Sequence, residues 1–329
     1  MKAIVYHEYG PPDVLDLEDV DNPVAEEGEV LVRVYGAAVN PGDWDLMKGT
    51  PYVLRLMTGL RRPKNKVLGL AVAGRIEAVG SNVLGFQPGD EVYAEIGKGG
   101  FAEYACVPED AVAMKPSNLT FAQAATVPVA GVTALQGLRD IGRVQPGHRV
   151  LINGAAGGVG TFAVQIAKAL GADVTGVCST TNVDLVRSIG ADRVIDYTQE
   201  DFSRGGKQYD LIFDNVGNRS LSDYRRALTP KGMLIPNSNK GNGHWIGGFL
   251  ARAVQALAVS PFVSQKLRPF ASTGKSEDLV ALTELIESGK VTPVIDRTYP
   301  LNETAEALSH YGQGHTRGKV VITTEPDEK

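Results

Sequence analysis

The sequence predicts an α/β protein built from two domains. Its 329 residues exceed the size at which one hydrophobic core usually stops growing. The first third reads as short strands separated by Pro/Gly turns, and from about Ala122 strands alternate with helical periods. Early in that second part, a glycine-rich turn joins a strand to a helix. Together these observations predict a β-rich domain and a domain with a doubly wound parallel sheet.

The β-rich domain is expected from Val-rich or alternating runs whose spacing is typical of a small barrel or sandwich. Turns such as Gly10-Pro11-Pro12 and Gln87-Pro88-Gly89-Asp90 separate them. The expected strands are Ala3 to Tyr6, Glu29 to Ala38, Ala71 to Val79, Glu91 to Ala94 and Ala102 to Val107.

The second part predicts βαβ units. Its expected strands are His148 to Asn153, Asp173 to Cys178, Val194 to Asp196, Asp210 to Asp214 and Met233 to Pro236, with helices after the first two. Near the C-terminus, two further strands are expected at Thr292 to Ile295 and Gly318 to Thr323. We therefore expect a first domain of residues 1–121, completed by 273–329, and a second domain of residues 122–272.

The turn after the first of these strands has the context that a dinucleotide-binding fingerprint requires. In the G-x-G-x-x-G register the three positions are Ala155, Gly157 and Gly160, so alanine replaces the first glycine. Gly157 lets the backbone approach a pyrophosphate, Gly160 allows close packing of helix on sheet, and the helix N-terminus favours phosphate. A tight βα turn without a ligand is the alternative.

The acid that normally bonds a ribose 2′-OH at the end of the next strand is absent. That strand ends Cys178-Ser179-Thr180-Thr181-Asn182. A carboxylate there would repel a 2′-phosphate, so its loss favours NADP(H) over NAD(H).

Composition excludes several classes. Two cysteines, Cys106 and Cys178, are too few for a disulfide framework or a thiolate zinc cage, and five histidines lack the i, i+4 spacing of a helical metal site. No apolar run reaches 18 residues and no signal peptide is evident, so we expect a cytoplasmic protein without a membrane partner. The net charge of −5 argues against nucleic acid.

The charge is unevenly placed. Acids are absent between Asp45 and Glu77 and between Asp223 and Glu277, and those stretches carry seven and eight Lys/Arg. Two solvated basic loops explain this pattern, as does a shared basic cleft for an anionic ligand. The apolar run from Trp245 to Val263 also fits a helix in a dimer interface.

Several motifs in order resemble the medium-chain dehydrogenase/reductase superfamily, and more closely its zinc-free quinone oxidoreductase branch. The motifs are Met1-Lys2-Ala3, Val39-Asn40-Pro41-Gly42-Asp43, Gly89-Asp90-Glu91-Val92, Gly100-Phe101-Ala102-Glu103-Tyr104, Ala130-Gly131-Val132-Thr133-Ala134, the glycine loop and Arg317-Gly318-Lys319-Val320-Val321. The resemblance implies a GroES-like catalytic domain built from both chain ends, with an inserted Rossmann domain.

The resemblance also argues against catalytic zinc. The positions of the three zinc ligands in alcohol dehydrogenases of this superfamily correspond to Asn40, Leu70 and Val129, which cannot supply that ligand set. The four-cysteine structural zinc lobe is missing too. Zinc-free relatives often keep an acid at the position of Ala71, and a conspicuous tyrosine of that branch falls at Asp45, so Tyr52 is a candidate to replace it.

The resemblance and the fingerprint together assign the expected site residues. The predicted catalytic residues are Asn40 and Tyr52, and the predicted cofactor-binding residues are Asn40, Thr133, Ala156, Gly157, Gly158, Val159, Ser179, Thr180, Tyr197 and Val216, with no metal ligand. Asn40 alternatively caps a turn, and Thr133 alternatively bonds its own helix.

With no metal and no nucleophilic constellation, the chemistry must come from the cofactor. We expect an NADPH-dependent quinone or enone reductase that acts on a small molecule, most simply as a homodimer. The competing class is a catalytically weak NADP(H)-binding protein with a structural or regulatory role.

Overall fold

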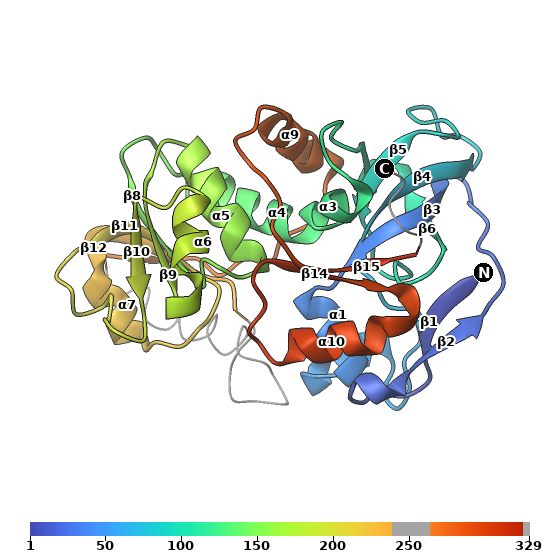
Figure 1. Ribbon diagram of the computed structural model, residues 1–329, viewed down its shortest axis with the longest axis horizontal. Helices are drawn as coiled ribbons and strands as arrows, with labels where there is room; N and C mark the ends of the chain where they lie inside the picture. The colour runs from blue at the N-terminus through green and yellow to red at the C-terminus, as the bar shows by residue number, and fades with distance from the viewer. Residues whose placement is uncertain (239–263, 325–329) are drawn as a thin grey trace. The chain divides into compact units, whose positions relative to one another are not determined.

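The computed structural model describes residues 1–238 and 264–324, which form two compact units (Figure 1). Within these ranges, unit 1 contains residues 1–132, 273–289 and 293–324, and unit 2 contains residues 133–238, 264–272 and 290–292. The run from Trp245 to Val263 lies outside the described residues. No helix in the described ranges is long and apolar enough to cross a membrane.

Unit 1 is built on a seven-stranded sheet in the order β14-β15-β3-β4-β5-β7, with β6 also pairing with β3. Its strands are β3 (Glu29–Ala38), β4 (Ala71–Val79), β5 (Glu91–Glu95), β6 (Tyr104–Pro108), β7 (Val112–Met114), β14 (Ile295–Pro300) and β15 (Lys319–Thr323). All pairs are antiparallel except β14 with β15. A separate hairpin joins β1 (Lys2–Tyr6) to β2 (Leu15–Asp19).

Helices of unit 1 are short. They are α1 (Pro41–Lys48), α2 (Arg55–Thr58), α3 (Phe121–Ala125), α9 (Ser276–Glu287) and α10 (Thr304–Gly312), and the chain passes to unit 2 within α4 (Val127–Leu135). Short 3-10 turns, among them η2 (Tyr52–Leu54), complete it.

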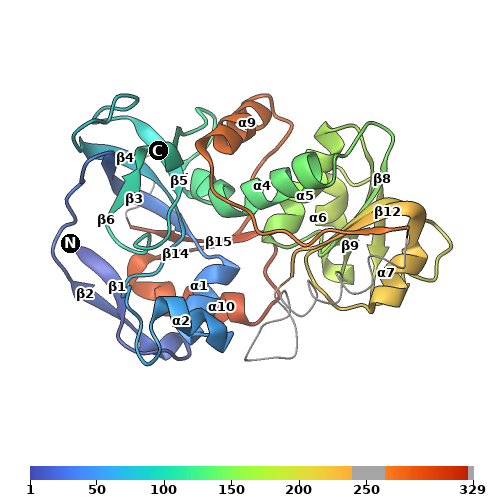
Figure 2. The same ribbon diagram turned by 180° about the vertical axis from the view of Figure 1, so that it is seen from behind.

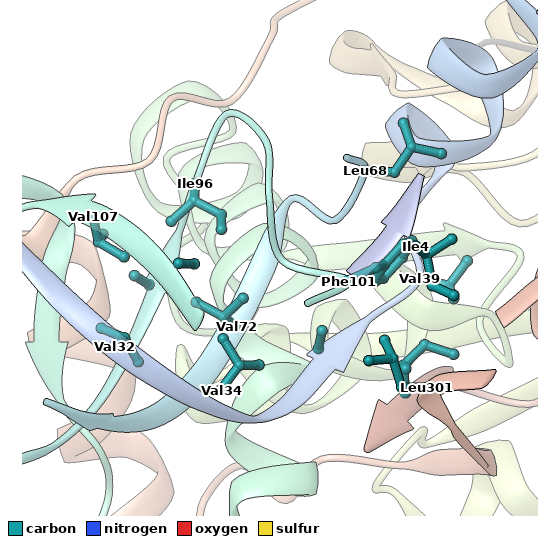
Figure 3. Packing of buried hydrophobic residues seen from close by; sticks show 14 of the residues in the cluster. Ile4, Val32, Val34, Val39, Leu68, Val72, Ile96, Phe101, Val107 and Leu301 are labelled. Atoms are coloured by element: carbon teal, nitrogen blue, oxygen red, sulfur yellow. The ribbon is translucent and has the colours of Figure 1, made fainter. Parts of the chain in front are cut away.

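The core of unit 1 is formed largely by alternate strand residues, whose side chains point to one face of the sheet. Val32, Val34, Val72, Phe101 and Leu301 all belong to this buried cluster (Figure 3). Period-two patterning predicts this, because one face of an antiparallel sheet is usually buried.

Unit 2 is a six-stranded parallel sheet in the order β10-β9-β8-β11-β12-β13. Its strands are β8 (Arg149–Asn153), β9 (Asp173–Cys178), β10 (Arg193–Asp196), β11 (Tyr209–Asp214), β12 (Leu228–Pro236) and β13 (Lys266–Leu267), and its helices include α5 (Gly158–Ala169), α6 (Val183–Ser188) and α7 (Leu221–Ala227) (Figure 2). The strand order reverses between β8 and β11, which makes their carboxyl ends the topological switch point.

One predicted strand is wrong. The run from Thr292 to Ile295 was expected to be extended, but β14 begins only at Ile295. The Gln165 side chain forms hydrogen bonds with both main-chain groups of Thr292: it donates to the carbonyl at 2.9 Å and accepts from the N–H at 2.8 Å. Pro293 has no N–H to offer to a ladder. Hydrogen bonds to a distant side chain therefore replace strand pairing at Thr292.

Candidate functional site

The glycine loop of unit 2 connects β8 to α5 at the switch point of the sheet. Gly154 has φ of +78°, a left-handed conformation that favours glycine, and its N–H and that of Ala155 donate to the carbonyl of Val177. The turn thus depends on Gly154, one residue before the position that the fingerprint register assigned to the missing glycine. Ala155 is fully buried and has no positive φ.

The other two glycines of the loop serve different purposes. A Cβ on Gly160 would lie 2.0 Å from the carbonyl oxygen of Gly154, so this position must be glycine for α5 to pack against the turn. A Cβ on Gly157 would meet only that same oxygen, at 3.5 Å. The fold leaves space beside Gly157, directly before the first turn of α5, whose N–H groups have no acceptor within the helix. A phosphate fits such a cradle.

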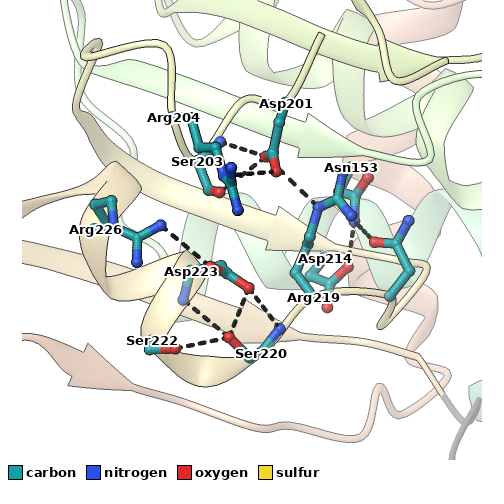
Figure 4. Close-up of polar contacts among 11 residues, drawn as sticks. Asn153, Asp201, Ser203, Arg204, Asp214, Arg219, Ser220, Ser222, Asp223 and Arg226 are labelled. Atoms are coloured by element: carbon teal, nitrogen blue, oxygen red, sulfur yellow. Dashed lines mark hydrogen bonds and ion pairs between the residues drawn. The ribbon is translucent and has the colours of Figure 1, made fainter. Parts of the chain in front are cut away.

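A buried polar network holds the neighbouring loop at the switch point. Asn153 at the end of β8 donates to Asp214 at the end of β11 at 2.8 Å and to Asn218 at 3.1 Å (Figure 4). Asp214, fully buried, also accepts from the N–H groups of Val216 and Gly217. A Cβ at position 154 would lie 2.7 Å from the Cγ2 of Val216, so Val216 packs over the glycine turn. Asn153 and Asp214 were missed by the sequence analysis, although polar residues ending two apolar strands were a usable signal.

The ends of β9 and β10 bring together three of the predicted cofactor residues. The N–H of Tyr197 donates to the Cys178 carbonyl at 3.0 Å, which places Tyr197, 48% exposed, beside Ser179. Ser179 Oγ accepts from the Asn182 amide at 3.1 Å. Thr180 donates to an acid that the sequence analysis overlooked, Asp196, at 2.6 Å.

Asp196 ends β10 directly opposite Cys178 in the parallel register. Its carboxylate accepts from the Thr180 hydroxyl and from the N–H and hydroxyl of Thr198. The Thr180 bond first, and the Thr198 bonds after it, lower the pKa of Asp196. The usual acid is absent after β9, but the ionised carboxylate of Asp196 follows β10 in the neighbouring position. It lies next to the hydroxyl of Thr180, which was predicted to bind phosphate.

Asn40 lies in unit 1, at the N-terminus of α1, inside a second polar network. Its amide oxygen accepts from Lys319 Nζ at 2.6 Å, and Lys319 also donates to the Val39 carbonyl at 2.6 Å. The Asn40 amide nitrogen donates to the Ala38 carbonyl, and the Asn40 N–H donates to Asp43 Oδ2 at 2.8 Å. Asn40, Asp43 and Lys319 are each at most 4% exposed.

Burial dominates the electrostatics of this network. It raises the pKa of Asp43 to about 7, although N–H groups of Asn40 and Gly69 and the charge of Lys319 act in the opposite direction. It lowers the pKa of Lys319 to about 8, against the charge of Asp43. Asp43 and Lys319 both lie within the family-like motifs of the sequence, but no role was predicted for either residue.

The remaining predicted residues lie as follows. Tyr52, 39% exposed, starts η2 with its ring 4.8 Å from the Arg55 guanidinium. The Thr133 hydroxyl lies 2.9 Å from that of Ser272. Ala156, Gly158 and Val159 belong to the glycine loop and the start of α5. In the described ranges, no three His, Cys, Asp or Glu side chains gather as a metal site.

Glu95, at the end of β5, is a further acid that the sequence analysis missed. It pairs across the sheet with Ala71, the position at which zinc-free relatives often keep an acid. Its Oε2 is buried and has no hydrogen-bond partner in the described structure, and burial raises its pKa to about 7. The carboxyl group therefore changes its protonation near neutral pH.

A β-rich unit formed from both chain ends, together with a parallel sheet carrying a glycine loop at its switch point, defines a dinucleotide-dependent dehydrogenase or reductase. Comparison with known proteins agrees: residues 26–117 match the alcohol dehydrogenase GroES-like domain and residues 189–322 match a zinc-binding dehydrogenase domain. The chain belongs to the medium-chain dehydrogenase/reductase superfamily, in its quinone oxidoreductase-like branch. The predicted family and fold class are confirmed.

Individual relatives cover almost the whole chain. It is 35% identical to mouse mitochondrial NAD(P)H oxidoreductase RTN4IP1, over 98% of this chain and 89% of the relative. It is 35% identical to the chloroplastic NADPH-dependent alkenal/one oxidoreductase of Arabidopsis thaliana, over 98% and 79%. The structure of Escherichia coli quinone oxidoreductase complexed with NADPH superposes with a TM-score of 0.84 at 26% identity, over 98% and 100%.

The two loop glycines predict different mutant phenotypes. Gly160→Ala should destabilise unit 2 by several kcal/mol, because its methyl group would collide with a backbone oxygen. Gly157→Ala should leave the melting temperature within about 2 °C of the parent and weaken NADPH binding at least tenfold, since its methyl group fills the cradle. Thermal unfolding and fluorescence titration separate the two, and equal stability losses would contradict this division of roles.

The buried Lys319 network predicts a large stability effect. Lys319→Met removes the donor of two buried acceptors and the charge facing Asp43, and should cost about 3–5 kcal/mol in the free energy of unfolding. The control is Lys2→Met, which breaks an equally short 2.6 Å ion pair with Asp19 whose side chains are 48% and 75% exposed. That change should cost far less, because solvent screens an exposed ion pair. Urea denaturation measures both, and equal losses would refute the burial argument.

Proposed function

We propose that this chain is a zinc-independent oxidoreductase that transfers hydride from NADPH to a quinone or an α,β-unsaturated carbonyl compound. Its family membership and the phosphate cradle at Gly157 support NADP(H) as the cofactor, as do relatives named NADPH-dependent or solved with NADPH. The relatives named for quinone and for alkenal/one substrates support the substrate class.

Zinc independence is supported by the residues at the expected ligand positions. Asn40 stands at the first of them, and its amide oxygen is already bonded to a buried ammonium group. Leu70 and Val129, at the other two, have no ligand atoms in their side chains. The positive charge of Lys319, 2.6 Å from that oxygen, opposes a second cation at the same place.

When bound, NADPH supplies the hydride, so the residues of this chain need only bind, orient and exclude water. In our proposal Gly157, Gly158 and Val159 hold the pyrophosphate at the N-terminus of α5, with Ala156 beside them. Ser179, Thr180 and Tyr197 hold the adenosine phosphate. The family resemblance assigns Val216 and Thr133 of unit 2, and Asn40 of unit 1, each to a contact with the nicotinamide, and it assigns Tyr52 to a hydrogen bond with the substrate. An electrophilic alkene or quinone requires no more than such positioning.

We further propose that the protein works as a homodimer in the cytoplasm, where its two free cysteines would stay reduced. Light scattering coupled to size exclusion tests the assembly, and cell fractionation tests the location. A monomer, or enrichment in an organelle fraction, would contradict these two proposals.

Metal independence gives the principal test of the reaction. NADPH oxidation with a panel of quinones and enones should persist after exhaustive chelation, and metal analysis should find less than about one zinc in ten chains. Stoichiometric zinc, or activity that chelation abolishes and zinc restores, would refute the mechanism. Tight NADPH binding without turnover on the whole panel would instead favour the structural or regulatory alternative.

Cofactor preference follows from the charges at the ends of β9 and β10. Ser179→Asp adds a carboxylate where the 2′-phosphate is expected and should shift preference toward NADH at least tenfold by like-charge repulsion. Asp196→Asn removes the existing carboxylate and should strengthen NADPH binding several-fold while NADH changes little. Titrations with both nucleotides measure the ratios. Tighter NADH than NADPH binding by the parent would overturn the assignment.

A further inference from the structure

The segment of residues 52–66 presents an unusual outer surface on unit 1. η2 and α2 run on from one another, and four large apolar side chains on them and just beyond are exposed to solvent, with Leu56 at 68%, Met57 at 80% and Leu60 at 68%. The four positions are Val53, Leu56, Met57 and Leu60. The spacing of the first three, i, i+3 and i+4, is that of a single helical face, and Leu60 follows Gly59, whose φ of +120° ends the helix.

This face is exposed although the segment itself is firmly held. From its inner side, Arg55 stacks 4.4 Å from the ring of Tyr9 and donates to the Gly49 carbonyl at 2.8 Å. The Tyr9 hydroxyl lies 2.9 Å from the Thr58 hydroxyl and donates to the Gly59 carbonyl at 2.8 Å. The apolar residues therefore point outward from an anchored element.

Uncompensated positive charge adjoins the apolar face. Four cations follow it within six residues, all exposed, and no ion pair involves any of them in the described part of the chain: Arg61, Arg62, Lys64 and Lys66. The exposed Lys98 adds a fifth, with its Nζ 3.3 Å from Asn65 Oδ1. No acid occurs between Asp45 and Glu77, in a chain of net charge −5.

We propose that this face docks on the surface of an anionic lipid bilayer. Apolar side chains beside a cluster of Lys and Arg are the two components of peripheral membrane binding: the first enter the boundary of headgroups and acyl chains, and the second meet lipid phosphates. The expectation of no membrane partner came from the lack of a spanning segment, and a peripheral contact needs none. Resting on the proposed function, docking would bring the reductase to quinones or enones dissolved in the bilayer.

The combination favours lipid over other occupants. An acidic protein would satisfy the cations but would not require this many exposed apolar side chains. A second copy of the chain, packed through the same face about a two-fold axis, would set these cations against each other. A lipid surface complements both halves of the segment at once.

Vesicle flotation provides the test. The parent should bind phosphatidylcholine vesicles containing about a third phosphatidylglycerol, bind pure phosphatidylcholine at least tenfold less, and lose binding as salt increases. Leu56→Glu with Met57→Glu should reduce binding at least tenfold. The matched control is Val24→Glu with Leu84→Glu, which makes the same charge change at two isolated apolar side chains that are 79% and 93% exposed. That pair should bind like the parent.

Activity measurements separate this inference from the proposed function. With a water-soluble quinone, the Leu56/Met57 variant should match the parent, whereas with a long-chain quinone held in anionic vesicles it should be several-fold slower. Failure of the parent to bind anionic vesicles, or equal losses in both double variants, would overturn the docking proposal. So would a loss of soluble-quinone activity, which would assign the face to the substrate site, or a change in oligomeric state. A parent that binds vesicles but reduces no quinone or enone contradicts only the proposed function.

Discussion

The Lys319 ammonium is the interaction on which unit 1 depends. It joins the C-terminal strand β15 to the residues after β3, 280 positions earlier, through two bonds of 2.6 Å. A buried charge without partners costs several kcal/mol, so Lys319, Asn40 and the backbone around them are stable only together. Asp43 extends the network to Gly69. The position that zinc relatives use for a metal ligand is thereby built into the framework of the fold.

The Asn40 network has a direct consequence for chemistry. Because its amide oxygen faces Lys319 and its nitrogen faces the Ala38 carbonyl, Asn40 serves first as a structural residue in the structure described here. If Asn40 also contacts the nicotinamide, these two hydrogen bonds fix the orientation of its amide group before the cofactor binds. Preorganisation of this kind suits a reaction in which the cofactor supplies the hydride and the protein supplies geometry.

The binding loop of unit 2 depends on a different physical constraint, because its tight turn leaves no room for side chains at two positions. Gly154 adopts a conformation that favours glycine, and Gly160 allows α5 to approach within contact distance of that turn. Gly157 has space around it, which the fold itself does not use. Asp214 and Asn153 then hold the adjacent loop so that Val216 covers the turn. Steric constraint and hydrogen bonding together shape one edge of the sheet for an anionic dinucleotide.

The class of fold and the main binding loop can be predicted from the sequence alone, because both depend on local patterns of residues. Strand β3, strand β4 and strand β9 have the bounds that alternation and apolar runs predicted, and the glycine loop lies between β8 and α5 as expected. Local sequence patterns do not predict that the Gln165 side chain, 127 residues away, forms hydrogen bonds with the main chain of Thr292. Nor could it place Asp196 beside Thr180, Glu95 beside Ala71 or Lys319 on Asn40. Those contacts join residues from different strands or from opposite ends of the chain, and only the register and closure of the sheets decide which side chains lie side by side.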